Sequence, residues 1–225
     1  METDHTVVER RLLDEGLRSG TVALDAGCGR TTRLRDYRDR IVRLVGVDVD
    51  AAAGRENPYL DEFHPADLDD VLPFDDASFD LVFSWGVIHH SSDMDRALSE
   101  LVRVLRPGGK LVLMVYHRRS LFFLVYRGFQ RFLPLARRVG LHFEGARVGE
   151  TEGLIARHFT VEELRRKLVG AGLRDVWIKP YGQDAELLPL PRQVRLPITE
   201  RIPRSVKDPI LRRVGHQLGV RATKP

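Results

Sequence analysis

The sequence has little sulfur and no apolar segment long enough to cross a membrane. Cys28 is the single cysteine among 225 residues, which excludes an intramolecular disulfide and a cysteine-based metal cluster. Residues 111–126 form the most apolar stretch, but His117 and two arginines interrupt it, and its uncharged runs fall far short of the roughly 20 residues that span a bilayer. The first residues also lack the basic and then apolar order of a signal peptide. We therefore expect a cytoplasmic protein without stable membrane insertion.

Charge is divided unevenly along the chain. The net charge of +4 combines an acidic first half with a basic second half. Residues 1–116 contain 22 acidic and 14 basic side chains, whereas residues 117–225 contain 10 acidic and 22 basic ones. This asymmetry is compatible with two ligand zones or with two ordinary solvated surfaces. With 43% hydrophobic and 30% charged residues, a chain of this length fits one α/β domain with some additions.

Apolar residues alternate between extended and helical spacing along the chain, which predicts strands separated by helices. Asp93 is placed as the N-cap of one helix, and Thr160 with Glu163 forms a capping-box pattern at another. This order predicts a mainly parallel sheet with helices on both faces, whose ligands bind beyond the carboxyl ends of the strands. The predicted strands are 21–25, 41–48, 62–68, 79–85, 110–116, 174–181 and 215–225, and the predicted helices are 7–17, 31–38, 94–105 and 160–173.

The segment LDAGCGR, residues 24–30, closes the first predicted strand at the edge where ligands bind. Gly27 and Gly29 lack Cβ atoms, so a ligand can lie against the main chain there. The helix predicted next would offer unpaired N–H groups to a carboxylate or phosphate, and Asp25 directs an acceptor at the same space. A Gly-x-Gly also occurs in simple tight connections, so the residues at the next strand ends decide the interpretation.

Carboxylates also close the second and third predicted strands. Asp48 lies 19 residues after Gly29, where a carboxylate accepts hydrogen bonds from the hydroxyls of a ribose. Asp67 is placed to accept from an adenine amino group, while the Leu68 N–H faces a ring nitrogen. The alternative for each acid is a loop residue that faces water. Three acceptors at three strand ends predict an adenosine site, and the missing third glycine of G-x-G-x-x-G argues against a dinucleotide.

Four segments make the sequence similar to a known family. They are LDAGCGR (24–30), GVDVD (46–50), ADLDDVLPFDDASFDLVFSWGVIHHSSD (66–93) and ALSELVRVLRPGGKLVLMV (97–115). In this order they resemble class I S-adenosylmethionine-dependent methyltransferases, in particular the type 11 group related to ubiquinone and menaquinone biosynthesis. The resemblance implies an α/β, Rossmann-like seven-stranded sheet, mostly parallel, with helices on both faces and an antiparallel last strand. It also implies a helical insertion after the fifth strand and S-adenosylmethionine as the methyl donor.

The resemblance assigns cofactor contacts to the matching positions. Thr31 stands where the family often has another glycine, and it can cap the following helix or bond the cofactor carboxylate. The implied contacts are the methionine-end residues Asp25, Gly27, Cys28 and Gly29, the ribose-binding Asp48, the adenine-binding Asp67 and Leu68, and Ser84 with Trp85 beside the reacting sulfur.

Two adjacent histidines are the candidates for a general base. His89 and His90 follow the fourth predicted strand, where the acceptor should lie, and a neutral imidazole suits deprotonation of a hydroxyl. His89 is the favoured one of the two. The alternative is that one of them caps residues 91–92 or packs under the next helix. Tyr116 and His117, at the end of the fifth strand, are second choices. We expect no metal, because the histidines are scattered and no acids follow these two strands.

The additions to the core are expected at residues 117–157 and 182–214. Residues 117–157 are rich in Phe, Leu and Arg, and they predict a lid over a partly apolar acceptor, a packed helix pair, or a membrane-contacting surface. Residues 182–214 are expected to be an extended basic connection, without the aromatic-interleaved pattern of a nucleic-acid site. The core would then comprise residues 7–116, 158–180 and 215–225 of one methyltransferase domain.

The favoured interpretation is an enzyme that transfers a methyl group from S-adenosylmethionine to a small, partly apolar hydroxylated acceptor by in-line displacement. A non-catalytic S-adenosylmethionine-binding or regulatory protein with the same fold is the main alternative. A nicotinamide-dependent oxidoreductase is disfavoured by the glycine pattern and by the VLRPGGKLVL segment.

Overall fold

The computed structural model describes residues 4–121, 123–124, 150–151, 154–182, 197–199 and 201–225. The described elements are α1 (Asp4–Gly16), β1 (Thr21–Ala26), the 3₁₀ helix η1 (Arg33–Tyr37), β2 (Ile41–Asp48), α2 (Ala51–Arg55), β3 (Glu62–Pro65), β4 (Phe79–Trp85), the 3₁₀ helix η2 (Ile88–His90), α3 (Met94–Val104), β5 (Leu105–His117), β6 (Glu150–Thr151), β7 (Leu154–Ile155), β8 (His158–Phe159), α5 (Val161–Gly170), β9 (Arg174–Tyr181), α7 (Arg204–Val214) and β10 (Gln217–Thr223).

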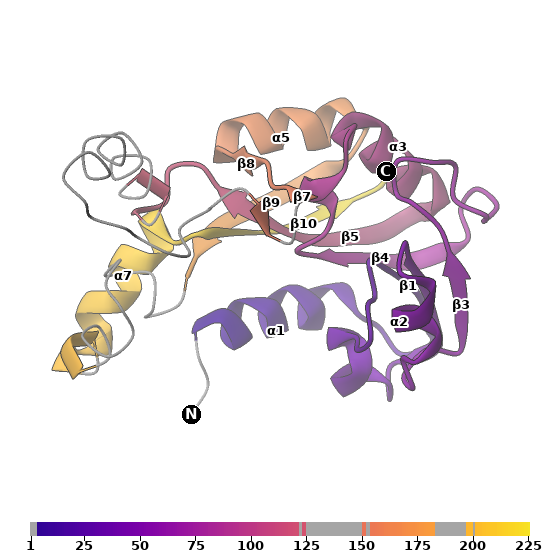
Figure 1. Cartoon of the computed structure of the whole chain (residues 1–225), viewed down its shortest axis with the longest axis horizontal. Helices are drawn as coiled ribbons and strands as arrows, with labels where there is room; N and C mark the ends of the chain where they lie inside the picture. The colour runs from indigo at the N-terminus through magenta and orange to yellow at the C-terminus, as the bar shows by residue number, and fades with distance from the viewer. Residues whose placement is uncertain (1–3, 122, 125–149, 152–153, 183–196, 200) are drawn as a thin grey trace, which may run out of the picture.

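One twisted sheet runs through the molecule in the order β3-β2-β1-β4-β5-β10-β9 (Figure 1). Strands β1 to β5 pair in parallel, whereas β10 is antiparallel to both β5 and β9, which confirms the expected antiparallel last strand. The sheet has eight strands instead of seven because the two-residue β8 adds a short parallel pairing to β5. Chain order reverses beside β1, so the carboxyl ends of β1, β2 and β4 surround a topological switch point.

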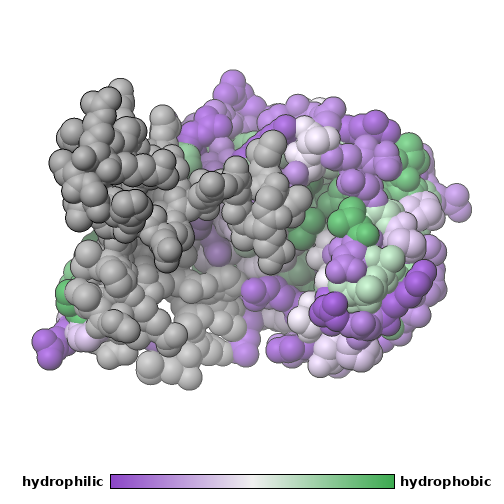
Figure 2. All heavy atoms as spheres, viewed as in Figure 1, coloured by the Kyte–Doolittle hydropathy of each residue, from purple (hydrophilic) through white to green (hydrophobic). Residues whose placement is uncertain are grey.

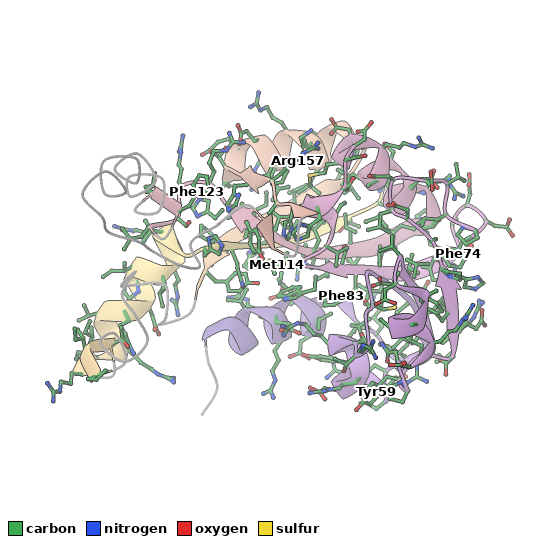
Figure 3. All side chains as sticks on the ribbon, in the orientation of Figure 1. Tyr59, Phe74, Phe83, Met114, Phe123 and Arg157 are labelled. Carbon is green, nitrogen blue, oxygen red and sulfur yellow. The ribbon has the colours of Figure 1, made fainter. Side chains whose placement is uncertain are left out.

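Helices cover both faces of the sheet, as the alternating pattern predicts. In Figure 1, α3 and α5 lie over one face and α1 lies under the other. Successive residues of β4 point to opposite faces, so Val82 joins Leu98 and Leu101 under α3, while Phe83 joins Leu12 and Leu13 of α1. Figure 3 shows Phe83 between β4 and α1. The two apolar layers fix which β4 and β1 side chains face α1 at the strand ends.

Both predicted helix caps are confirmed. The Asp93 carboxylate accepts from the N–H groups of residues 95 and 96 at the start of α3. The Thr160 side chain accepts from the Glu163 N–H, and the Glu163 carboxylate accepts from the Thr160 N–H, which completes the capping box of α5. Helix α3 ends at Val104 and β5 begins at once, so residues 107–109 lie inside a long strand instead of a separate loop.

The helix predicted over residues 31–38 is wrong in length and type. Only Arg33–Tyr37 is helical, as a single 3₁₀ segment, and its cap is Thr32, which accepts from the Leu34 N–H at 3.0 Å. Thr31 itself is exposed. The physical reason is chain length, because β2 begins at Ile41 and leaves too few residues for further turns. The turn after β1 therefore has no full helix whose N-terminus could bind an anion.

The two additions are described in part. Most of residues 117–157 lie outside the described residues, so the helical insertion and its role as lid, packed pair or membrane contact remain predictions. The connection 182–214 is not wholly extended, because α7 occupies its last eleven residues, with Pro209 inside the helix. Figure 2 shows a largely hydrophilic surface over the described part, with small apolar patches. No helix among the described residues has the length and apolarity that a membrane crossing requires.

Candidate functional site

The turn after β1 is built around two glycines in left-handed conformations. Gly27 has φ +90° and its N–H donates to the Val47 carbonyl at 2.8 Å. A Cβ on Gly27 would lie 2.3 Å from a Val87 methyl, so a larger residue does not fit. Gly29 has φ +51°, and a Cβ there would meet no atom of the described chain within 4 Å. The buried Asn57 amide donates to the Gly29 carbonyl at 3.2 Å and holds the turn in place.

Asp48 is fixed at the end of β2 by main-chain donors. Its Oδ2 accepts from the Gly29 N–H at 2.8 Å, and its Oδ1 accepts from the Asp50 N–H at 2.9 Å. The carboxylate therefore ties the glycine turn to the end of β2. Each oxygen keeps a second lone pair, which is the capacity that a ribose diol would use.

A cleft of about 580 Å³ opens at the switch point of the sheet, within the size range of small-molecule sites. Its walls come from the turn after β1, the end of β2, the loop after β3 and the loop after β4. It therefore brings together four of the predicted cofactor residues and one of the two histidines. The lining residues are Gly27, Val47, Asp48, Val49, Ala66, Asp67, Leu68, Asp69, Gly86, Val87, His90, Ser91 and Ser92.

The end of this cleft that is predicted to bind adenine is closed by Asp69, a neighbour of the predicted residues. Asp67 is exposed and accepts from the Asp69 N–H at 3.0 Å, whereas the Leu68 side chain is buried in the core. Asp69 accepts from the Ser91 hydroxyl and from the Ser92 N–H, the latter at 2.7 Å. Its partial burial would raise its pKa, but these hydrogen bonds outweigh that effect and lower the pKa to about 2. Asp69 thus ties the loop after β3 to the loop after β4.

Five predicted residues, Trp85 among them, lie beside the cleft instead of lining it. Asp25 is buried on the α1 face of β1, and burial raises its pKa to about 7, with a hydrogen bond from the Thr32 side chain opposing the rise. Cys28 is also buried, which raises the pKa of its thiol to about 12. The Ser84 hydroxyl is buried and has no hydrogen-bond partner among the described residues. Gly29 is half-buried and is not among the residues that line the cleft.

The two histidines of η2 have different environments. His90 lines the cleft, whereas His89 is wholly buried behind it, with the two rings 4.2 Å apart. Burial, reinforced by the neighbouring imidazoles, lowers the pKa of His89 to about 3. The loop is held on two sides (Figure 3): the Gly86 N–H donates to the Met114 carbonyl, and the Arg157 N–H donates to the His89 carbonyl at 3.0 Å. His90 is therefore the one of the pair that faces the cleft.

Of the two second-choice residues, Tyr116 belongs to a cluster of rings where β5 ends and β8 and β10 begin. The Tyr116 ring lies 4.2 Å from that of His89, 4.7 Å from that of His216 and 5.3 Å from that of His158. His117 is directed elsewhere, with its Nδ1 2.9 Å from the Gly215 carbonyl. Burial lowers the pKa of His158 and His216 to about 4 each. Among the described residues, no group of three or more His, Cys, Asp or Glu is arranged to hold a metal ion.

Sequence reasoning missed three residues that shape the site. Asn57 fixes the glycine turn, Val87 fills the space behind Gly27, and Arg33 lies over the end of β4. Arg33 and Asn57 carry no motif, because their contacts come from elements distant in sequence. Val87 could have been identified from the requirement that something occupy the Cβ position of Gly27.

The cleft fits an adenosyl cofactor. A wall without a side chain at Gly27, a fixed carboxylate at the end of β2, and an exposed carboxylate after β3 are features that an adenosine requires. Residues 24–113 match the methyltransferase domain family of type 11. Together with the sheet order, this match makes residues 24–113 similar to methyltransferase domains.

Individual relatives also bear the names of methyltransferases. The chain is 36% identical over 107 residues to a malonyl-[acyl-carrier protein] O-methyltransferase of Erwinia billingiae, covering 46% of this chain and 42% of that protein. It is 29% identical over 170 residues to 27-O-demethylrifamycin SV methyltransferase of Amycolatopsis mediterranei, covering 70% and 55%. A chain in the complex of the Haloferax volcanii Trm112 methyltransferase activator with a methyltransferase superposes with a TM-score of 0.64 at 21% identity, covering 98% of this chain and 88% of that one.

The sequence matches and the structural match support different statements about this chain. The chain spans about half the length of the curated relatives it matches. The structural likeness, at 21% identity, shows the fold alone.

Proposed function

We propose that this protein transfers the methyl group of S-adenosylmethionine to an oxygen of a small, partly apolar metabolite. The observation that carries the proposal is the single cleft in which Gly27, Asp48, Asp67 and His90 meet at the switch point. Two relatives bear names that specify O-methyl transfer, which supports oxygen as the atom methylated. The sulfonium of the cofactor supplies an electrophilic methyl group, so the protein's task is alignment and deprotonation of the acceptor.

In this proposal the residues of the cleft have separate tasks. The Asp48 carboxylate binds the ribose hydroxyls, and Asp67 with the Leu68 N–H binds the adenine edge. His90 accepts the acceptor's proton at the end of the cleft next to Gly86. His89 packs behind His90 and keeps its ring in place, because a buried imidazole with a pKa of about 3 is a poor base at neutral pH.

Methyl transfer from S-adenosylmethionine to a panel of phenolic and alcoholic acceptors tests this assignment. We expect His90→Ala to lower kcat by about 10²-fold or more, the usual contribution of a positioned base, with cofactor affinity unchanged. The matched control is His64→Ala, at the edge strand β3 and outside the cleft. Equal turnover by the wild-type protein and His90→Ala would exclude His90 as the base.

The non-catalytic alternative is distinguished in the same assay. A protein that binds S-adenosylhomocysteine but transfers no methyl group to any acceptor would favour a binding or regulatory role for the same fold. Methyl transfer that occurs only to nitrogen acceptors would retain the enzyme and contradict the O-methylation proposal.

A further inference from the structure

The loop after β4, residues 86–93, brings His90 to the wall of the cleft at the switch point. Its helical part, η2, is a single turn of three residues. Within the loop, the His90 N–H donates to the Val87 carbonyl at 2.8 Å and the Ser91 N–H donates to the Ile88 carbonyl at 3.2 Å. A segment with so few bonds of its own takes its position from the elements around it. The direction of the His90 ring therefore depends on contacts that other parts of the chain make with this loop.

Asp69 holds the part of the loop that follows His90. Its Oδ1 accepts from the Ser91 hydroxyl, and its Oδ2 accepts from the Ser92 N–H at 2.7 Å. The Asp93 N–H donates to Oδ1 at 3.4 Å. These donors belong to the three residues directly after His90, so the carboxylate fixes the chain on the C-terminal side of the ring.

Arg157 contacts the same loop with both its main chain and its side chain (Figure 3). Its N–H donates to the His89 carbonyl at 3.0 Å, and its Nη2 donates to the Ser92 carbonyl. These carbonyls bracket residues 90 and 91. A single residue therefore ties the chain before His90 to the chain after it.

The main chain beside Arg157 is itself anchored on the sheet. Arg157 immediately precedes β8, whose two residues pair in parallel with the last two residues of β5. The Arg118 N–H donates to the Phe159 carbonyl at 2.8 Å, and its Nε donates to the His158 carbonyl at 3.0 Å. The side chains of His158 and Phe159 are both buried. Because β8 is fixed in this way, the contacts from Arg157 set the loop after β4 relative to the strand ends.

We propose that Arg157 is a positioning residue for methyl transfer: by bridging the His89 and Ser92 carbonyls, and together with Asp69, it holds the His90 ring in reach of the acceptor. This inference rests on the proposed function, because Arg157 contacts no reacting group in it and acts only through His90. A base must lie within hydrogen-bond reach of the proton that it removes, and a displacement of about 1 Å can cost about 100-fold in rate. The contribution of Arg157 therefore depends on the presence of His90.

The turnover of Arg157→Met tests this assignment with the phenolic or alcoholic acceptor that the wild-type protein methylates fastest. Methionine keeps the main-chain N–H but removes the side-chain donor to the Ser92 carbonyl, and the exposure of Arg157 allows the change without loss of the fold. We expect kcat to fall about 3- to 10-fold, the usual effect of losing one hydrogen bond. The dissociation constant of S-adenosylhomocysteine should change less than about twofold, and Arg157→Lys should restore part of the lost turnover.

A double-mutant cycle with His90→Ala separates positioning of the base from general support of the loop. In the His90→Ala protein, Arg157→Met should change kcat less than about twofold, because the residue through which it acts is absent. Arg165→Met is the matched control, since Arg165 also donates its Nη1 to a main-chain carbonyl, that of Val176 at 2.7 Å, but joins α5 to β9. It should leave kcat unchanged.

Two results would overturn the inference while the proposed function stands. One is equal kcat for the wild-type protein and Arg157→Met. The other is a loss of the same size with and without His90, which would reduce Arg157 to a structural support of the loop. A wild-type protein that methylates no acceptor of the panel would instead overturn the proposed function.

Discussion

At the scale of single residues, the site depends on positions where the backbone permits one residue type. Gly27 combines a φ of +90° with a Cβ position already filled by Val87, so both strain and contact exclude larger residues. Gly29 has a positive φ but open space above it. The LDAGCGR pattern indicated both glycines, but it could not show that a Cβ is excluded at Gly27 and has open space at Gly29.

Gly27→Ala should therefore destabilise the fold. A left-handed backbone costs a Cβ-bearing residue about 1–2 kcal/mol, and the Val87 contact adds an overpacking cost of similar size. We expect a loss of at least about 2 kcal/mol in the free energy of urea unfolding. Gly170→Ala is the matched control, because Gly170 ends α5 with no atom within 4 Å of its Cβ position. Equal stabilities of the two variants would contradict this account of the turn.

Asp48 and Asp67 differ in how far their loss would disturb the fold. Asp48 accepts two main-chain N–H groups that shape the turn, so its replacement would mix structural and binding effects. Asp67 is exposed and makes a local bond to the Asp69 N–H. Asp67 is for this reason the better residue for a binding test.

At the scale of elements, the sequence predicted correctly the helix caps, which depend only on neighbouring residues. The Asp93 cap and the Thr160–Glu163 capping box depend on residues within one turn, and both are confirmed. The helix over 31–38 was overpredicted, because its length is set by the distance to β2 and not by its own residues. The pairing of β8 with β5 had no signal in the two-residue segment 158–159, since its partner Tyr116 lies over 40 residues earlier.

We expect the free energy of unfolding to fall in acid because of a buried histidine where β5 meets β8 and β10. The His158 side chain is buried, its ring stacks 4.2 Å from Phe123, and burial lowers its pKa from 6.5 to about 4. A histidine with a lowered folded-state pKa contributes stability that is complete above pH 6.5 and is lost as the pH falls toward 4. Between pH 7 and pH 5 this loss is about 2 kcal/mol for one such group.

Urea unfolding of the wild-type protein and of His158→Gln at pH 7 and pH 5 measures this contribution. The variant should lose about 2 kcal/mol less than the wild-type protein over this interval, whatever its absolute stability. His64→Gln, on the exposed edge strand β3, should behave like the wild-type protein. The same pH dependence in all three proteins would show that His158 is not held neutral by the fold.

At the scale of the whole molecule, strand order explains why distant residues form one site. Parallel β1, β2 and β4 meet at the switch point, so segments near residues 27, 48 and 87 converge although about 20 to 60 residues separate them. The fold class and this convergence could be predicted from the alternation of elements and the family resemblance. The separation of His89 from His90 could not, because burial of one ring depends on β5, β8 and β10 together.

The acidic and basic halves of the chain occupy different parts of the fold. The acidic first half supplies the strand ends that line the cleft at the switch point, and the described C-terminal part supplies β9, α7 and β10 at the far end of the sheet (Figure 1). An adenosine with a cationic sulfonium suits carboxylates at these ends better than a pyrophosphate would.

Titration of S-adenosylhomocysteine into the wild-type protein, Asp67→Ala and Asp70→Ala by calorimetry tests the central claim most directly. Asp70 is exposed three residues after Asp67 and does not line the cleft, so it controls for the lost charge. We predict binding by the wild-type protein, an affinity about 10-fold lower for Asp67→Ala, and a change of less than about twofold for Asp70→Ala. The absence of binding by the wild-type protein, or equal affinities in all three, would contradict an adenosyl cofactor in this cleft.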